Sequence, residues 1–119
     1  MEKGRIETSI GQIIISKDVI AQYAGCVAMT TTGIVGMAMI SMRDGVYKLL
    51  KKESLRKGVD VSIENNEISI DFHIIVAYGI NVKTIADNVI NNVCYEVEQF
   101  AGMKVKEINL YIEGVKMID

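Results

Sequence analysis

The feature that most constrains the fold is a strict alternation of apolar and polar residues on both sides of Asn65-Asn66. Val59, Val61 and Ile63 alternate with polar residues before this dipeptide. The alternation resumes after it at these apolar positions: Ile68, Ile70, Phe72, Ile74 and Val76. A period of two is typical of strands with one buried face. Two consecutive asparagines suit the left-handed backbone of a two-residue turn. The sequence therefore predicts a β-hairpin over residues 58–77.

Two segments with helical periodicity are available to cover the apolar face of this hairpin. Residues 17–29 follow Ser16, a favourable N-cap, and place Asp18 in the first turn, where the helix dipole favours a carboxylate. A second helix begins after Asn81 and ends at Gly102. Its apolar residues form one continuous stripe: Val82, Ile85, Ala86, Val89, Ile90, Val93, Val97 and Phe100.

Further strands are predicted on either side of these helices. The run Ile13–Ile15 is β-branched, and an earlier edge strand is expected around Ile6. The segment Ile34–Met42 is apolar on both faces, as in a central strand. The last strand, Val105–Ile112, changes its alternation phase, which predicts a bulge near Lys106-Glu107.

The resulting order is β-α-β, a basic connection, then β-β-α-β. It predicts an α+β fold in which two main helices cover one face of a mixed, mostly antiparallel sheet, as a two-layer sandwich. The chain has 119 residues, and we expect residues 1–119 to form one domain. The lysine-rich connection, residues 43–57, is compatible with either a loop or a short helix.

Composition excludes several classes of protein. Hydrophobic residues make up 50% of the chain and charged residues 24%, with a formal net charge of -2, which argues against disorder and against DNA as a partner. The longest uncharged apolar stretch, Gly33–Met42, is about half of the ~20 residues that a membrane-spanning helix needs. With no signal-peptide pattern and two cysteines, we expect a cytoplasmic protein that does not insert into the membrane.

The search for catalytic or cofactor chemistry finds little. His73, the single histidine, shares a strand face with Asp71, and such a pair is able to act as a general base. No nucleophile or metal ligand stands at a readable spacing from it, so we expect a surface pair with no catalytic role. The two cysteines, Cys26 and Cys94, flank apolar helix positions and are expected to be buried or half-buried small hydrophobes. We predict no catalytic residue, no metal site and no cofactor.

One weak motif and one basic run remain open. Gly33-Ile34-Val35-Gly36 has the G-x-x-G spacing of a KH-type RNA-binding loop, but its middle residues are apolar and it leads into a strand. RNA is therefore not the expected ligand. The basic run from Lys48 to Lys57 is interpreted as a solvated connection.

With these elements laid out, a set of positions spread over nearly the whole sequence matches a known family pattern. These positions are Gly4, Ile6, Gly11, Ile13, Ile15, Ser16, Val19, Ile20, Ala24, Gly33, Val35, Gly58, Val59, Val61, Asp71, Val76, Tyr78, Gly79, Val82, Val93, Val97, Gly102, Val105, Ile108, Asn109, Gly114 and Val115. On these residues the chain resembles the alkaline shock protein family of Gram-positive bacteria, also called envelope stress response proteins. Asn91 departs from the pattern, because the family usually carries glutamine there.

The resemblance implies a non-enzymatic cytoplasmic protein of the envelope stress response or of envelope homeostasis. Some members of the family gather beneath the membrane by binding a membrane-anchored relative, and some self-assemble. The chain is similar to the short, compact branch often encoded beside a fatty-acid-kinase-like protein, which makes that protein another candidate partner. A ligand-binding regulatory module and an RNA-binding protein are the alternative functions.

The expected contact surface is either an exposed strand edge, which is able to pair with a strand of another chain, or the sheet face turned away from the helices. Ile75 and Ala77 alternate away from the core positions of the hairpin, and Tyr111 does so on the last strand, yet none of them is charged. Helices on one face of a sheet leave the other face for a partner to cover. The competing explanation is that residues 43–57 fold back over this face within the chain.

Overall fold

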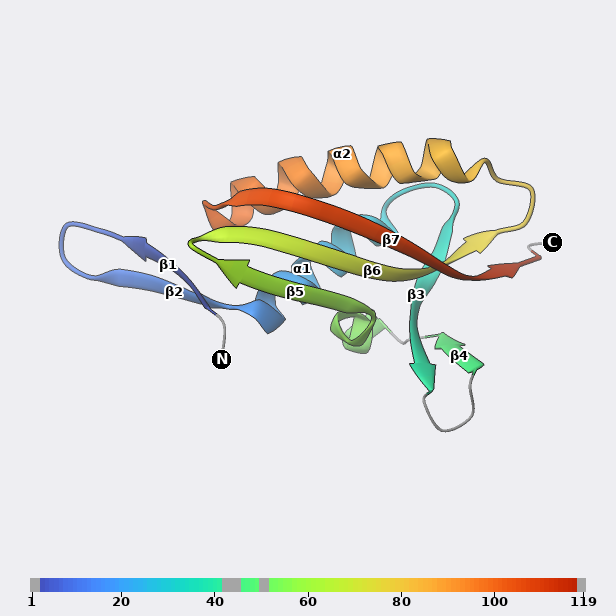
Figure 1. The fold of residues 1–119 in the computed structure, drawn as a ribbon, viewed down its shortest axis with the longest axis horizontal. Coiled ribbons are helices and arrows are strands. Elements are labelled where there is room, and N and C mark those ends of the chain that lie inside the picture. The colour runs from blue at the N-terminus through green and yellow to red at the C-terminus, as the bar shows by residue number, and fades with distance from the viewer. Residues whose placement is uncertain (1–2, 42–45, 50–51, 118–119) are drawn as a thin grey trace.

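The computed structural model describes residues 3–41, 46–49 and 52–117. Figure 1 shows the described elements as a twisted sheet with two helices on one face and a two-stranded arm that projects from one end. In chain order the elements are β1 (Lys3–Glu7), β2 (Gln12–Ser16), α1 (Lys17–Met29), β3 (Ile34–Ser41), β4 (Val46–Leu49), the 3-10 helix η1 (Lys52–Gly58), β5 (Val59–Glu64), β6 (Glu67–Ala77), α2 (Val82–Ala101) and β7 (Lys104–Lys116). The α+β prediction is confirmed.

The predicted hairpin is present as β5 and β6. Its strands pair antiparallel from Val59–Phe72 to Glu64–Glu67. Asn65 and Asn66 have φ angles of 54° and 59°, the left-handed conformation that a tight two-residue turn requires. The local sequence pattern therefore determines both the strands and the turn.

Strand β6 is the centre of the sheet. β7 runs parallel to β6 and occupies one edge of it along residues 67–77 of β6. The other edge of β6 is shared by two antiparallel strands: β5 pairs with residues 67–72 and β3 with residues 74–76. β4 pairs antiparallel with β3. Among the described strands none pairs with the second edge of β7.

Both helices begin and end where their caps predict. The Ser16 side chain accepts a hydrogen bond from the Val19 backbone N–H, and Asn81 does the same for Thr84. Gly102 ends α2 with a φ of 69° in the left-handed region, which favours glycine. The helices share one core with the inner face of the sheet. Its fully buried side chains include Ile20, Ala24, Ile68, Ile70, Phe72, Ile74, Val89, Val93 and Val97.

The predicted stripe of α2 is wrong at its two ends. Val82 is 47% exposed and Phe100 is 43% exposed. The buried residues of α2 recur every four positions and end at Ala101, which takes the inward position expected for Phe100.

The predicted bulge in the last strand is confirmed, and a second one was missed. The β6–β7 register shifts between the pairs Ile68–Val105 and Ser69–Glu107, so Lys106 is an extra residue. It shifts again between Ile74–Ile112 and Ile75–Gly114, which leaves Glu113 as the second extra residue.

The connection between β3 and β5 contains the short strand β4 and the 3-10 helix η1. The expected short helix is therefore present as η1, whereas the strand β4 was not expected. The prediction for the whole of residues 43–57 falls partly outside the described residues, at 43–45 and 50–51. The expected long strand at Ile34–Met42 is present as β3.

Strands β1 and β2 form a separate two-stranded sheet, called here the arm. It is tied to the domain body where β1 passes the β5–β6 turn. The Asn66 side chain donates to the Arg5 carbonyl at 2.9 Å and accepts from the Arg5 N–H at 3.3 Å. Ile6 lies over Gly102, where an added Cβ would stand 3.1 Å from its Cδ1.

Candidate interaction surface

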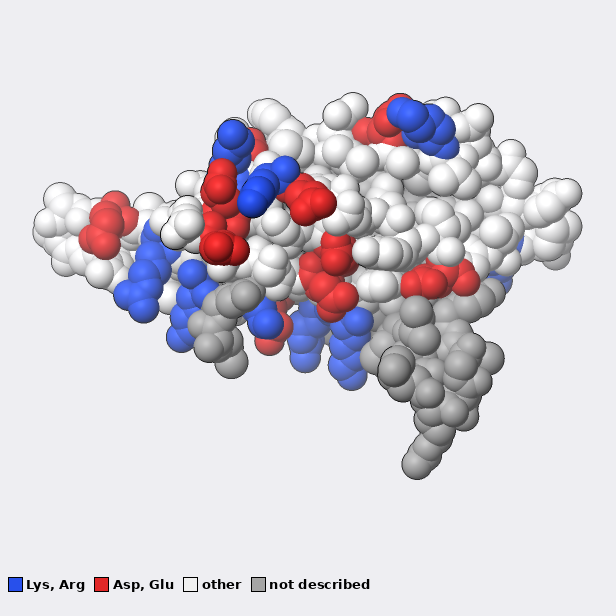
Figure 2. All heavy atoms as spheres, in the orientation of Figure 1, with Lys and Arg blue, Asp and Glu red and all other residues white. Residues whose placement is uncertain are grey.

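The outer face of the sheet, on the side away from α1 and α2, carries polar side chains in cross-strand rows. Register places Asp60 of β5 opposite Asp71 of β6, and Asp71 opposite Asn109 of β7. In the next row His73 lies opposite Tyr111. Figure 2 shows acidic side chains over the middle of this face. The outer face is therefore polar and acidic at its centre.

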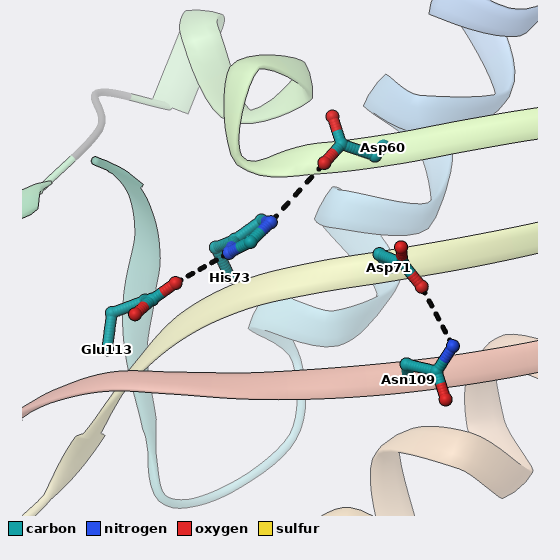
Figure 3. Close-up of polar contacts among 5 residues, drawn as sticks. All are labelled: Asp60, Asp71, His73, Asn109 and Glu113. Carbon is teal, nitrogen blue, oxygen red and sulfur yellow. Dashed lines mark hydrogen bonds and ion pairs between the residues drawn. The ribbon is translucent and has the colours of Figure 1, made fainter. Parts of the chain in front are cut away.

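His73 connects three strands on this face (Figure 3). Its Nδ1 lies 2.6 Å from Oε2 of Glu113 on β7, and its Nε2 lies 3.3 Å from Oδ2 of Asp60 on β5. The imidazole also stacks on the Tyr111 ring, with centroids 4.9 Å apart and an interplanar angle of 14°. Glu113 is the bulge residue of β7, and its carboxylate reaches the imidazole.

This geometry corrects the expected Asp71–His73 pair. Asp71 accepts a hydrogen bond from the side chain of Asn109 at 2.9 Å, so the two residues contact different partners. Neutral imidazole has one N–H, and only the protonated ring donates to both Glu113 and Asp60. Because both nitrogens face carboxylates, neither is directed at a hydroxyl or thiol nucleophile. The cluster acts as a cross-strand tether.

No metal centre is apparent in the part of the chain that the structure describes. There, no group of three or more histidine, cysteine, aspartate or glutamate side chains is placed to hold a metal ion. His73, which would be the natural ligand, already contacts two carboxylates from different strands.

The three residues predicted as a partner surface have different environments. Ile75 is only 3% exposed, so its side chain is not available to a partner. The core cluster that lies between the helices and the sheet does not include Ile75 or Ala38 of the neighbouring strand β3. Both side chains are nevertheless buried. Ala77 is half-buried, and Tyr111 is 48% exposed. Of the three residues, Tyr111 alone is exposed.

Sequence reasoning missed the apolar end of β7. Tyr78, Ile112, Val115 and Met117, called here the C-terminal patch, are exposed large hydrophobic residues. The backbone N–H of Tyr78 donates to the Lys116 carbonyl at 2.9 Å, which holds the ends of β6 and β7 together. The sequence analysis named Val115 only as a position that resembles the family. Because the bulge at Glu113 shifts the alternation of the strand, the sequence pattern did not predict that Val115 is exposed.

The cysteines differ from each other. Cys26 is exposed, which corrects the expectation of burial, and its Sγ accepts from Gln22 Nε2 at 3.7 Å. Cys94 is half-buried, as expected. Burial raises the pKa of the Cys94 thiol, and the negative charge of Glu98 and a hydrogen bond with Glu98 raise it further.

The Gly33–Gly36 segment does not join two helices as a KH-type loop does. Gly33 has a φ of 100° in the turn after α1, and Gly36 lies within β3 at a register shift. A Cβ at Gly33 would approach Ile85 Cδ1 to 2.9 Å. Packing against α2 and the tight turn therefore account for the first glycine without a phosphate ligand.

Comparison with known proteins places this fold in a bacterial envelope context. Residues 5–117 match the alkaline shock protein 23 family, described as having a cell envelope-related function. The chain is 42% identical over 113 residues to the uncharacterized protein YloU of Bacillus subtilis (strain 168), covering 94% of each chain. It is 33% identical over 115 residues to the uncharacterized protein Spy1614 of Streptococcus pyogenes serotype M6, covering 96% of this chain and 95% of that protein.

A more distant relative carries a functional name. The stress response regulator gls24 homolog of Streptococcus pyogenes serotype M3 is 28% identical over 106 residues, which are 89% of this chain and 59% of that protein. No solved structure matches the chain. In the described residues, neither helix combines the length and apolar character needed to cross a bilayer.

Proposed function

Since the chain belongs to the alkaline shock protein 23 family, whose function is cell envelope-related, we propose that it is a non-enzymatic adaptor of the envelope stress response. It acts through protein–protein contacts rather than through chemistry on a substrate. The observation that carries this proposal is β7, a strand of 13 residues with one partner strand among those described and an exposed apolar end.

An unpaired edge of this length favours strand addition by a partner protein. Backbone N–H and C=O groups along a free edge are able to pair with an extended segment, while side-chain pockets supply specificity. Lysines discourage edge pairing, and β7 carries Lys104 and Lys106 in its first half. The second half of the strand carries one lysine, Lys116 at its very end, and none from Tyr111 to Val115. The partner therefore docks at the second half of β7, beside the C-terminal patch.

The outer face supports contact rather than catalysis. The two ring nitrogens of His73 contact the carboxylates of Glu113 and Asp60. These contacts between strands make the part of the sheet that carries Tyr111 more rigid. A rigid surface loses little conformational freedom when a partner binds.

The expected partner is a membrane-anchored member of the same family, which would hold a cytoplasmic protein at the periphery of the membrane. The fatty-acid-kinase-like protein implied by the sequence resemblance is the second candidate. A stress-response role agrees with the printed name of the gls24 homolog.

The test compares recovery of envelope proteins by two variants. Val115→Lys places a charge at a position that is 55% exposed in the C-terminal patch, and Tyr95→Lys does so at a position that is 63% exposed on α2. Each protein is purified from native envelopes, and the proteins recovered with it are identified by mass spectrometry. A membrane-anchored relative should be recovered with the wild type and with Tyr95→Lys. The amount of this relative recovered with Val115→Lys should be about tenfold lower. Equal recovery with Val115→Lys, or no envelope protein with the wild type, contradicts the proposal.

A further inference from the structure

The sheet has a second strand edge without a partner, on the side opposite β7. β5 pairs with β6 along one side, and no described strand pairs with its other side (Figure 1). A hollow of about 360 Å³, called here the β5 hollow, is lined by residues 59–61 of this strand. Val59 and Val61 are buried on the inner face, whereas Asp60 is exposed on the outer face. What these three consecutive residues present together to the hollow is therefore the backbone of the strand edge.

The free backbone groups of β5 are suited to an extended polypeptide. Successive residues of a strand direct their N–H and C=O groups to opposite edges in alternation. At least one of residues 59–61 therefore directs both groups toward the hollow. A second strand is the ligand that pairs with such groups by main-chain hydrogen bonds.

The other walls of the β5 hollow carry basic side chains. The first turn of α1 contributes Lys17 and Asp18, and the end of η1 contributes Arg56 and Lys57. In the described part of the chain, none of the three cations has an ion-pair partner. Figure 2 shows basic side chains along this edge of the molecule, below the acidic middle of the outer face. These unpaired cations are available to a negatively charged partner.

Two carboxylates line the same hollow without reversing its charge. Oδ2 of Asp60 already contacts Nε2 of His73, at 3.3 Å. Asp18 lies in the first turn of α1, where the positive end of the helix dipole offsets its charge. The three cations therefore leave the walls positive, and the hollow fits an acidic segment better than a basic one.

A second and more apolar groove adjoins the β5 hollow. It has a volume of about 540 Å³, and Asp18 and Arg56 line both spaces. One of its walls is formed by the rings of Tyr23 and Phe100, which stack with centroids 4.0 Å apart. A segment that lies along β5 therefore has room for an apolar side chain beyond Arg56.

We propose that this edge binds an extended acidic segment of a partner protein by strand addition. The segment pairs with the backbone at residues 59–61, and its carboxylates face the three cations. A neighbouring apolar side chain packs on Tyr23 and Phe100. The site lies on the opposite side of the sheet from β7 and includes no residue of the C-terminal patch, so it is independent of the proposed function. An adaptor with one partner on β7 keeps this edge for a second protein.

Two fluorescently labelled synthetic peptides test the proposal. The first alternates aspartate and valine and ends in phenylalanine, and the second has lysine in place of aspartate. Fluorescence anisotropy should show that the wild type binds the acidic peptide at least about tenfold more tightly than the lysine peptide. The double variant Arg56→Glu, Lys57→Glu should weaken binding of the acidic peptide by about tenfold or more. The matched control Lys104→Glu, Lys106→Glu, with the same change of charge on β7, should bind nearly like the wild type.

Hydrogen exchange separates strand addition from a simple attraction of charges. With the acidic peptide bound, at least one amide among residues 59–61 should exchange about tenfold more slowly. The same peptide methylated on its backbone nitrogens has no N–H to donate to β5, and it should bind about tenfold more weakly. Arg56 and Lys57 are exposed, so their replacement should leave the fold intact, and circular dichroism checks this.

Each contrary result has a definite meaning. No binding of the acidic peptide overturns the proposal, and so does equal binding by Arg56→Glu, Lys57→Glu. Binding without slower exchange at residues 59–61 overturns strand addition. If vesicles of phosphatidylglycerol bind in place of the acidic peptide, the cations serve a lipid surface and the proposal is wrong. Peptide binding that persists in Val115→Lys, when that variant loses the membrane-anchored relative, supports two independent sites.

Discussion

His73 is the side chain that joins the most distant parts of the outer face. It contacts Glu113, 40 positions later in the chain, and Asp60, 13 positions earlier. Its stacking on Tyr111 adds a ring contact between β6 and β7. One imidazole thus links β5, β6 and β7, which gives this histidine a structural role on the outer face of the sheet.

The tether predicts an energetic coupling between His73 and Glu113. We expect His73→Phe, which keeps a ring on Tyr111 but loses both polar ring nitrogens, to lower the free energy of unfolding by about 1–2 kcal/mol. Glu113→Gln should cost less in the His73→Phe background than in the wild type. Urea unfolding of the four proteins of this double-mutant cycle measures the difference. Additive effects of the two changes would show that the contact does not stabilise the sheet. Asp71→Asn, next to but outside the tether, serves as the control.

The two thiols should differ in reactivity. Burial and Glu98 raise the pKa of Cys94, so a smaller fraction of this thiol is ionised at a given pH, and the thiolate is the reactive form. We expect alkylation of Cys94 to be at least about tenfold slower than that of the exposed Cys26 at pH 7.5. Peptide mass spectrometry over time follows both sites in one sample. Faster labelling of Cys94 would contradict its described environment.

At the scale of elements, α2 connects the sheet to the helical layer. Its buried residues at every fourth position face the core, and Val89 is fully buried. Gly102 then reverses the chain so that β7 returns parallel to β6. The α2 stripe therefore determines both the core and the position of the edge strand.

A charge on this stripe should unfold the domain, whereas one at its outer end should not. Val89→Asp buries an unpaired carboxylate, and we expect a loss of more than about 3 kcal/mol in the free energy of unfolding. Val82→Asp is the matched control, because Val82 is 47% exposed and lies in the first turn, where the helix dipole favours a carboxylate. Thermal unfolding compares the two. An unchanged melting temperature in Val89→Asp would mean that the stripe does not face the core.

Elements that depend on neighbouring residues were predictable from the sequence. The Asn65-Asn66 turn, the Ser16 cap and the bulge at Lys106 each follow from a few adjacent residues. The burial of the Ile75 side chain was not predictable from the sequence. Alternation shows which side chains share a face of the sheet, but it does not show whether other residues cover that face. The His73–Glu113 contact depends on a second bulge and on parallel pairing across 40 positions, neither of which leaves a local signal.

At the scale of the whole molecule, the chain divides into a body with one core and an arm attached at a few points. Ile10 at the arm tip is 98% exposed, whereas Ile20 in the body is fully buried. The sequence predicted the strands of the arm but not its projection. Ile13 looks like a core residue by type, and only the absence of a third strand beside β1 and β2 in the described fold leaves it exposed.

The attachment of the arm to the body should depend on the Asn66 side chain. Asn66→Gly keeps the left-handed φ of 59° that the turn needs, but it removes both hydrogen bonds to the Arg5 backbone. We expect the Arg5 amide to exchange with deuterium about tenfold faster, because its acceptor is gone, while amides of β5 and β6 keep their protection. Asn65→Gly is the control, since it changes the same turn without touching the hydrogen bonds to Arg5. If both variants exchange at Arg5 like the wild type, contacts other than the Asn66 hydrogen bonds, such as the packing of Ile6 over Gly102 and of Gly4 against Met103, hold the arm.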